Sequence, residues 1–202
     1  MHMLRSQGCD LDFEPFSPIF KKEFHYMRLE GQFDAALNLL DEFYDGFKHL
    51  SFHCDDEQNK KILSRYRTIF LYRENIEETA ISLALARLTK VYKKTAAPSF
   101  YYAMKARLDP DMVLQIAKQA KQHQNYIEFA KNCYVVSYER LYCSAEKQEI
   151  KKRIFNFCEL EIKNEAGIDY YLDTCHKLNK NLNEQVENYD QVMEYLSKNL
   201  HT

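Results

Sequence analysis

Glycine and proline are scarce in this chain, and most of them stand where a helix is expected to begin or end. Only four of each occur among 202 residues. Ser17-Pro18 and Asp109-Pro110 have the order of an N-cap followed by proline at the first helical position. Gly31 and Gly167 stand where a left-handed residue closes a helix. No Asn-Gly or Asp-Gly turn is flanked by alternating residues, so no β-hairpin is predicted.

Apolar residues between these marks recur at the spacing of one-sided helices. The pattern predicts helices over residues 33–47, 55–70 and 126–141, among about ten in all, with short connections that favour antiparallel neighbours. The expected fold class is therefore all-α, either an α-solenoid of helical hairpins or an irregular helical bundle. Residues 1–16 lack periodicity and are expected to form an irregular arm, followed by one helical domain over residues 17–202.

One segment resembles a single tetratricopeptide-type helical hairpin, over residues 17–48. In that repeat a glycine turn is followed by an aromatic residue and then by a small alanine, which Gly31, Phe33 and Ala36 match. The match covers about one repeat, and Lys48 replaces the closing proline of the family pattern. The resemblance implies an antiparallel pair of helices, which a looser helical-hairpin stack would also contain.

The charge balance argues against nucleic acid as the partner. The 28 Lys and Arg nearly cancel the 30 Asp and Glu, which removes a global attraction to polyanions. Basic residues do gather in two groups, and acidic residues lie close to both. The default interpretation is a solvated face with neighbouring ion pairs. The two groups are Lys60, Lys61, Arg65, Arg67 and Arg73, and Lys147, Lys151, Lys152 and Arg153.

The six cysteines include no Cys-x-x-Cys pair, and four of them lie within helical patterns. No secretory signal is visible, and the longest apolar run is far shorter than the ~20 residues needed to cross a bilayer. We therefore expect free thiols, no membrane span, and the cytoplasm or another reducing compartment.

Two histidines provide the one candidate metal site. His49 and His53 are spaced one helical turn apart, and Cys54, Asp55 and Asp56 follow. Two imidazoles on one helical face can ligate a metal, which a carboxylate or thiolate could complete. The alternative is that these residues are solvated or cap the next helix. A small metal-dependent helical enzyme or metal-binding protein using His49 and His53 is thus the second functional hypothesis.

The first hypothesis is a non-enzymatic protein–protein interaction module, acting as an adaptor, a regulatory factor or a subunit of a larger assembly. Each candidate catalytic arrangement in the sequence is better explained by a structural role, and no cofactor is implied. Helical-hairpin folds also provide extended contact surfaces. Tyrosines outside the apolar stripes are the candidate partner-binding residues, because exposed Tyr is typical of interface anchors. They are Tyr101, Tyr134, Tyr142 and Tyr170.

Overall fold

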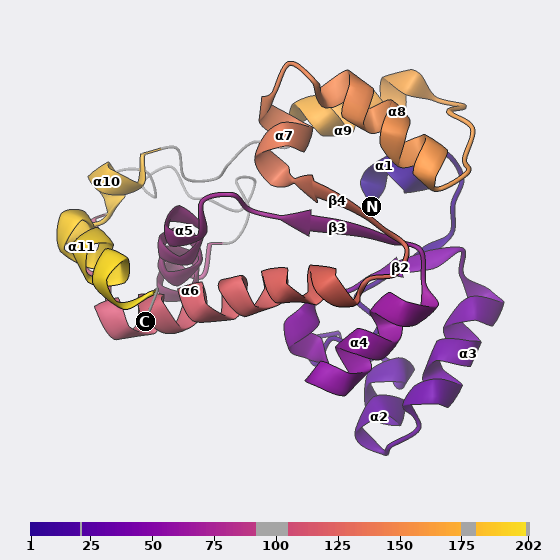
Figure 1. Cartoon of the computed structure of the whole chain (residues 1–202), viewed down its shortest axis with the longest axis horizontal. Helices are drawn as coiled ribbons and strands as arrows, with labels where there is room; N and C mark the ends of the chain where they lie inside the picture. Colours follow the sequence, from indigo (N-terminus) through magenta and orange to yellow (C-terminus); the bar gives the residue numbers. More distant parts are fainter. Residues whose placement is uncertain (21, 92–104, 175–180, 201–202) are drawn as a thin grey trace. The chain divides into compact units, whose positions relative to one another are not determined.

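A computed structural model describes residues 1–20, 22–91, 105–174 and 181–200 (Figure 1). The first part of the chain contains α1 (His2–Arg5), β1 (Leu11–Phe13), α2 (Glu23–Leu29), α3 (Phe33–Phe43), β2 (Gly46–Lys48), the 3-10 helix η1 (Ser51–His53), α4 (Asp56–Arg65), β3 (Thr68–Tyr72) and α5 (Ile76–Thr89). The second part contains α6 (Pro110–Asn125), the 3-10 helix η4 (Tyr126–Phe129), β4 (Cys133–Ser137), α7 (Tyr138–Cys143), α8 (Lys147–Phe157), α9 (Glu165–Thr174), α10 (Leu182–Gln185) and α11 (Tyr189–Asn199).

The expected all-α class is wrong. The structure is 61% helix and 10% strand, with eleven α-helices and two small parallel sheets among the described residues. β1 pairs with β2, and β3 pairs with β4. Helix predominates, but the class is mixed α/β. Residues 1–16, expected to be irregular, contain α1 and β1.

The missed strands occupy short apolar runs that also fit a helical stripe. β3 has the sequence Thr-Ile-Phe-Leu-Tyr and β4 the sequence Cys-Tyr-Val-Val-Ser. β-branched and aromatic residues pack well on a pleated surface, and their side chains lose χ1 freedom in a helix. Periodicity alone cannot distinguish such a run from a buried turn of helix, which is why residues 55–70 and 126–141 were predicted to be helical throughout.

β2 replaces the end of the helix expected over residues 33–47. α3 ends at Phe43 because Tyr44 turns to extended backbone, and the N–H of Asp45 then donates to the carbonyl of Asp10. β2 can lie close to β1 because Gly46 has no side chain. A Cβ at Gly46 would stand 3.3 Å from Leu11 Cδ2. The parallel register pairs Leu11 with Gly46, so α2 and α3 form the crossover between the two strands.

The chain divides into two compact units by its internal contacts. That residues 17–202 form a single domain stays a prediction. The first unit draws on Met1–Phe70, Tyr126–Val136 and Arg140–Cys175, and the second on Leu71–Asn125, Ser137–Glu139 and His176–Thr202.

One core of the first unit surrounds Phe16, which is fully buried. The Phe16 ring lies 5.1 Å from that of Phe33 and 6.1 Å from that of Phe47, measured between centroids. α2 and α3 pack as a hairpin against this core, and Gly31 makes the turn between them with φ of +76°. A left-handed residue at this place is readily supplied by glycine. The core residues are Phe16, Phe33, Ala36, Leu37, Leu40 and Ile62.

A second core of the first unit holds the N-terminal helix. α1 packs against α9, and the buried side chain of Gln7 fastens the chain after α1 to the loop before α9. Gln7 Oε1 accepts from the N–H groups of Lys163 (2.7 Å) and Asn164 (2.8 Å), and its Nε2 donates to the carbonyl of Asn164 (3.0 Å). The core residues are Met3, Val136, Leu141, Ile150, Ile154, Phe155, Ile168 and Leu172.

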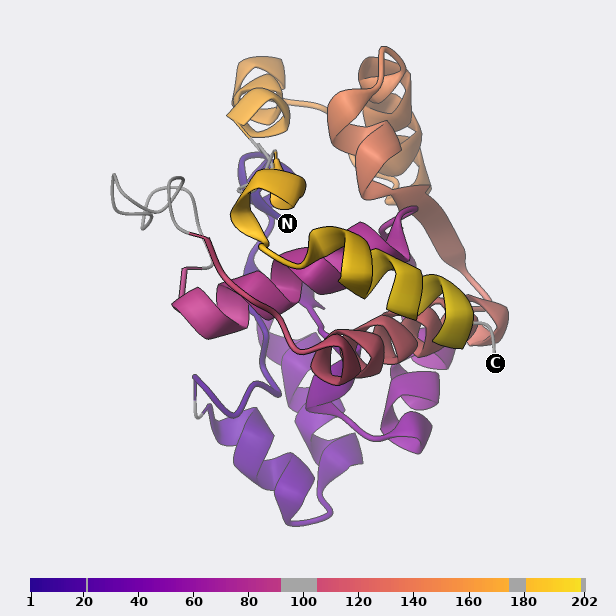
Figure 2. The ribbon, with the colours of Figure 1, turned by 90° about the vertical axis from the view of Figure 1, so that its left-hand side faces the viewer.

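The second unit is built from α5, α6, α10 and α11, and the yellow α11 lies alongside α6 in Figure 2. α5 presents Ala80 and Ala84, both with no exposed surface, to this core. The side chain of Asn188 makes two hydrogen bonds to the backbone of Leu108: its Oδ1 accepts from the N–H (3.0 Å) and its Nδ2 donates to the carbonyl (2.8 Å). These bonds join segments 80 residues apart.

Candidate functional site

The four predicted tyrosines have different surroundings. Tyr101 lies outside the described residues. Tyr134 on β4 and Tyr142 on α7 are half-buried and pack against the second core of the first unit. Tyr170 on α9 is 64% exposed. Of the three tyrosines that the structure describes, Tyr170 is thus the one with a largely accessible side chain, and their binding role stays a prediction.

The two predicted histidines do lie close together, but not on one helix. His49 follows β2 and His53 ends η1, and their ring centroids are 6.4 Å apart. His49 Nε2 lies 2.7 Å from Oδ1 of Asn59, whose Nδ2 donates to the carbonyls of Ser51 and Cys54. Because the amide nitrogen faces carbonyls, the amide oxygen accepts and His49 Nε2 is the donor. That nitrogen therefore carries a proton and is occupied in this geometry.

The metal hypothesis gains no third ligand from the part of the chain that the structure describes. No group of three or more His, Cys, Asp or Glu side chains there could hold a metal ion. Burial raises the pKa of Cys54 to about 12, so this thiol is protonated at neutral pH. Metal binding at His49 and His53 stays a prediction.

His53 instead belongs to a group of polar residues that sequence analysis did not assemble. Burial lowers the pKa of His53, the charge of Glu14 opposes this, and the charges of Lys48, Arg28 and His25 reinforce it. We call these five residues the polar cluster. His53, His25 and Glu14 are themselves buried, at 5%, 8% and 7% exposure. The neutral imidazole of His53 thus lies in a desolvated position among cations.

The parallel pairing of β1 with β2 builds one side of this cluster. The N–H of Glu14 donates to the carbonyl of Lys48 (3.0 Å), and the Lys48 ammonium makes an ion pair with the Glu14 carboxylate. Glu14 has φ of +55°, a left-handed conformation that is uncommon for a residue with a side chain. Such strained positions persist only where the surroundings hold them, and they are frequent at functional sites.

α2 contributes the other side of the cluster. His25 Nδ1 donates to the carbonyl of Phe16 (3.0 Å), which orients the ring. Arg28, one turn further on, is half-buried, and its Nε is buried without a hydrogen-bond partner. No ion pair joins Arg28 to a carboxylate among the described residues. Since Glu14 and Lys48 cancel each other, the guanidinium of Arg28 is the permanent positive charge that remains in the cluster.

Exposed apolar side chains lie on the elements that carry the polar cluster. Tyr26, Leu29 and Phe52 are 48%, 61% and 76% exposed. The Tyr26 ring lies 5.5 Å from that of His25, and the Phe52 ring lies 4.6 Å from that of His53. Leu29 is one helical turn from His25. We call Tyr26, Leu29 and Phe52 the α2–η1 surface.

This surface is part of a local excess of exposed apolar residues. Of the eleven large apolar residues exposed in the described parts of the chain, six fall between residues 19 and 52. The six are Ile19, Phe20, Tyr26, Leu29, Phe43 and Phe52. A signal was present in the sequence, since Tyr26 and Leu29 lie off the stripe formed by Phe20, Phe24 and Met27. Their connection to Phe52 and His53 depends on non-local packing and could not be found from the sequence.

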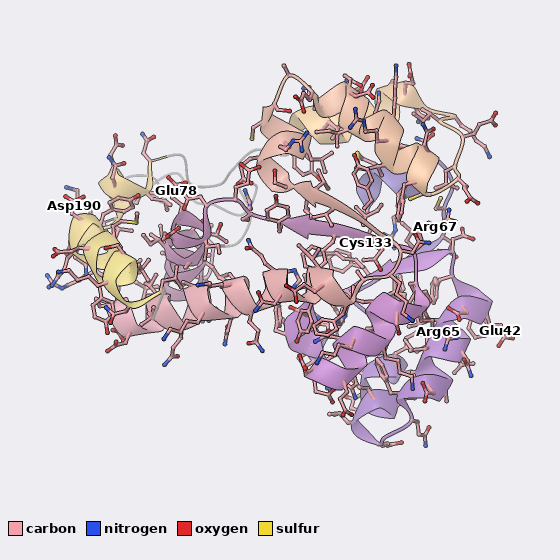
Figure 3. All side chains as sticks on the ribbon, viewed as in Figure 1. Glu42, Arg65, Arg67, Glu78, Cys133 and Asp190 are labelled. Carbon is pink, nitrogen blue, oxygen red and sulfur yellow. The ribbon has the colours of Figure 1, made fainter. Side chains whose placement is uncertain are left out.

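The first basic group of the chain carries carboxylate partners throughout. Lys61 and Arg65 on α4 pair with acids of α3, and Arg67, just before β3, pairs with Glu159. Arg65 and Arg67 are labelled in Figure 3. Exposed pairs of this kind add little stability, but they cancel the local field. That nucleic acid is not the partner stays a prediction. The five pairs are Lys60–Asp56, Lys61–Asp34, Arg65–Asp41, Arg67–Glu159 and Arg73–Glu139.

Comparison of the chain with protein families, with curated proteins and with solved structures gives no match. Among the residues that the structure describes, no helix has both the length and the apolar character needed to cross a membrane. The described cysteines, Cys9, Cys54, Cys133, Cys143 and Cys158, are free thiols, and Cys175 lies outside the described residues.

Proposed function

We propose that this protein is a protein–protein interaction module, an adaptor, regulatory factor or subunit of a larger assembly, which binds its partner through the α2–η1 surface. The observation that carries the proposal is that Tyr26 and Leu29 on α2 and Phe52 on η1 are large apolar side chains that are exposed next to residues of the polar cluster. Interface hot spots are enriched in aromatic residues and arginine, and a cluster of exposed apolar residues is a mark of a contact site.

The hydrogen bonds of the surrounding residues support a preformed surface. The amide of Asn59 ties together the segment that contains η1, and His25 fastens α2 to the carbonyl of Phe16. These bonds place Phe52 and Tyr26 on elements that are held by side chains buried in the same unit. A surface held in this way loses little conformational entropy when a partner binds.

A pair of surface variants tests the proposal. Leu29→Ser with Phe52→Ser removes both apolar side chains, whereas Leu88→Ser removes an apolar side chain of 55% exposure on α5. Tagged wild-type protein, the double variant and the control are each incubated with native lysate, and retained proteins are quantified by mass spectrometry. The expected result is a partner retained by wild type and by Leu88→Ser and lost from the double variant.

Two further measurements make the result decisive. Thermal melts show whether the double variant is folded, and it should be, because both side chains are exposed. Sedimentation of the purified protein shows whether the partner is a second copy, in which case the double variant should be monomeric. Retention of every partner by the folded double variant would refute the proposed surface. Metal-dependent turnover by the purified protein would instead favour the enzyme hypothesis.

A further inference from the structure

Phe52 is 76% exposed, so its position depends mainly on the backbone of η1 and little on the packing of its ring. η1 is three residues long and has few backbone bonds of its own. The N–H of His53 donates to the carbonyl of Leu50 (2.9 Å), and the N–H of Cys54 donates to that of Ser51 (3.3 Å). Because 3-10 geometry gives poorer hydrogen bonds than an α-helix, bonds from a neighbouring element decide how firmly η1 is held.

The side-chain amide of Asn59, on α4, supplies such bonds at both ends of η1. Its Nδ2 donates to the carbonyl of Ser51 (2.9 Å), where η1 begins, and to that of Cys54 (3.2 Å), just after η1 ends. Asn59 is 3% exposed, so these bonds are shielded from water. The hydroxyl of Tyr126, at 3.4 Å, is a more distant neighbour of the same nitrogen. One amide group thus holds the chain on both sides of Phe52.

Further bonds fix the orientation and the position of this amide. His49 Nε2 lies 2.7 Å from Oδ1 of Asn59, so the amide accepts at one end and donates at the other. α4 itself begins at a capping box, in which Asp55 and Gln58 exchange bonds between side chain and backbone. The N–H of Asn59 then donates to the carbonyl of Asp55 (3.0 Å). The side chain of Asn59 therefore extends from a helix start that is stabilised locally.

We propose that Asn59 is the positioning residue of the α2–η1 surface: by holding η1 in one conformation it fixes Phe52 and sets the affinity of the surface for a protein segment. This inference rests on the proposed function and adds the residue that controls it. A partner that meets a fixed Phe52 does not have to order η1 on binding, whereas a partner that meets a mobile η1 does. Asn59→Asp isolates this role, because the carboxylate still accepts from His49 but cannot donate to the two backbone carbonyls.

The mobility of η1 is the first readout, and it needs no partner. Hydrogen exchange followed by NMR should be about tenfold faster or more at the N–H groups of His53 and Cys54 in Asn59→Asp than in wild type, since losing both amide bonds lets η1 open locally. Asn188→Asp is the matched control: the buried amide of Asn188 lies in the second unit, and its Nδ2 also donates to a backbone carbonyl. It should leave exchange at His53 and Cys54 unchanged, which separates positioning of η1 from a general loss of stability.

Peptide affinity is the second readout. A peptide is selected on the folded full-length protein from a phage-displayed random library, and it serves as the probe if Leu29→Ser with Phe52→Ser abolishes its binding. Fluorescence anisotropy then gives its affinity for each variant. Asn59→Asp should weaken the binding about tenfold, because the peptide must order η1 when it binds. Asn188→Asp should bind the peptide as wild type does.

Three results would overturn the inference. The first is wild-type exchange at His53 and Cys54 in Asn59→Asp. The second is unchanged peptide affinity in Asn59→Asp; the α2–η1 surface then stands, because the peptide depends on Leu29 and Phe52, and the role of Asn59 alone fails. The third is fast exchange of the side-chain amide protons of Asn59 in wild type, a measurement that does not require the variant to fold. Selection of no peptide that depends on Leu29 and Phe52 would instead contradict the proposed function, and this inference with it.

Discussion

Replacing Asn188 by aspartate should destabilise the second unit at neutral pH and should do so less in acid. The amide of Asn188 is 9% exposed and makes both a donor and an acceptor bond to the backbone of Leu108. In Asn188→Asp the carboxylate can still accept from the N–H of Leu108. It cannot donate to the carbonyl, which is then buried opposite a negative oxygen. The shape of the side chain is almost unchanged, so packing is not the variable.

The expected loss at pH 7 is about 2–4 kcal/mol in the free energy of unfolding. A lost hydrogen bond accounts for about 1 kcal/mol, and leaving a buried acceptor unpaired adds roughly 1–3 kcal/mol. Burial and the facing carbonyl should raise the pKa of the new carboxyl above its unfolded value of about 3.9. The penalty should therefore grow as pH rises through that raised pKa and shrink as pH falls, because a protonated carboxyl can donate to the carbonyl.

Urea denaturation followed by circular dichroism, at pH 7 and at about pH 5, measures this difference against wild type at each pH. Asn38→Asp is the control: Asn38 is exposed and uses its amide oxygen to accept from Arg65, a bond that a carboxylate keeps. Its effect should stay within about 0.5 kcal/mol. The reasoning about Asn188 is refuted if the two variants are equally stable at pH 7, or if the penalty is the same at both pH values.

Three other properties can be measured on the first unit. Burial lowers the pKa of His53 below 6.5, so the unfolded chain binds the proton first and the free energy of unfolding should fall as pH drops below about 6.5. His53→Gln should reduce this pH dependence in urea melts, and an unchanged pH dependence would exclude His53 as its cause. Gln7→Ala should lower the free energy of unfolding by about 2–4 kcal/mol in the same assay, because it leaves backbone groups of the loop before α9 without partners. A loss under about 0.5 kcal/mol would show that water replaces the amide. In thiol titration of the native protein, the exposed Cys143 should react well before Cys54, whose pKa is about 12; equal rates would show that Cys54 is accessible.

Three helix starts were predictable because a helix N-terminus depends on a few adjacent residues, whereas Ser17-Pro18 is followed by a turn and α2 begins only at Glu23. Asp109-Pro110 predicted the start of α6, which begins at Pro110. Asn75 and Glu78 have the spacing of a capping box, and Oδ1 of Asn75 accepts from the N–H of Glu78 (2.8 Å) at the start of α5. Asp55 caps α4 in the same way, through the N–H of Gln58. Each of these signals acts over three or four residues and needs no tertiary contact.

The strands and the polar cluster could not be predicted, because both depend on pairing between distant segments. β1 is three residues long and has no β signature of its own, and it exists through its register with β2. The same pairing brings Glu14 to Lys48 and both of them towards His53. Sequence analysis did single out His49 and His53, from their spacing of one helical turn. Their proximity in the structure comes instead from the fold of the segment between β2 and α4.

Hydrogen–deuterium exchange of the protein with and without its captured partner tests the central claim most directly, because it locates the contact without altering the chain. The account predicts that binding slows exchange in Glu23–Leu29 and Ser51–His53, the elements that carry the α2–η1 surface. Exchange in α5, where the exposed Leu88 lies, should be unchanged. Protection confined to α5, or to the segments around Tyr134, Tyr142 and Tyr170, would contradict it.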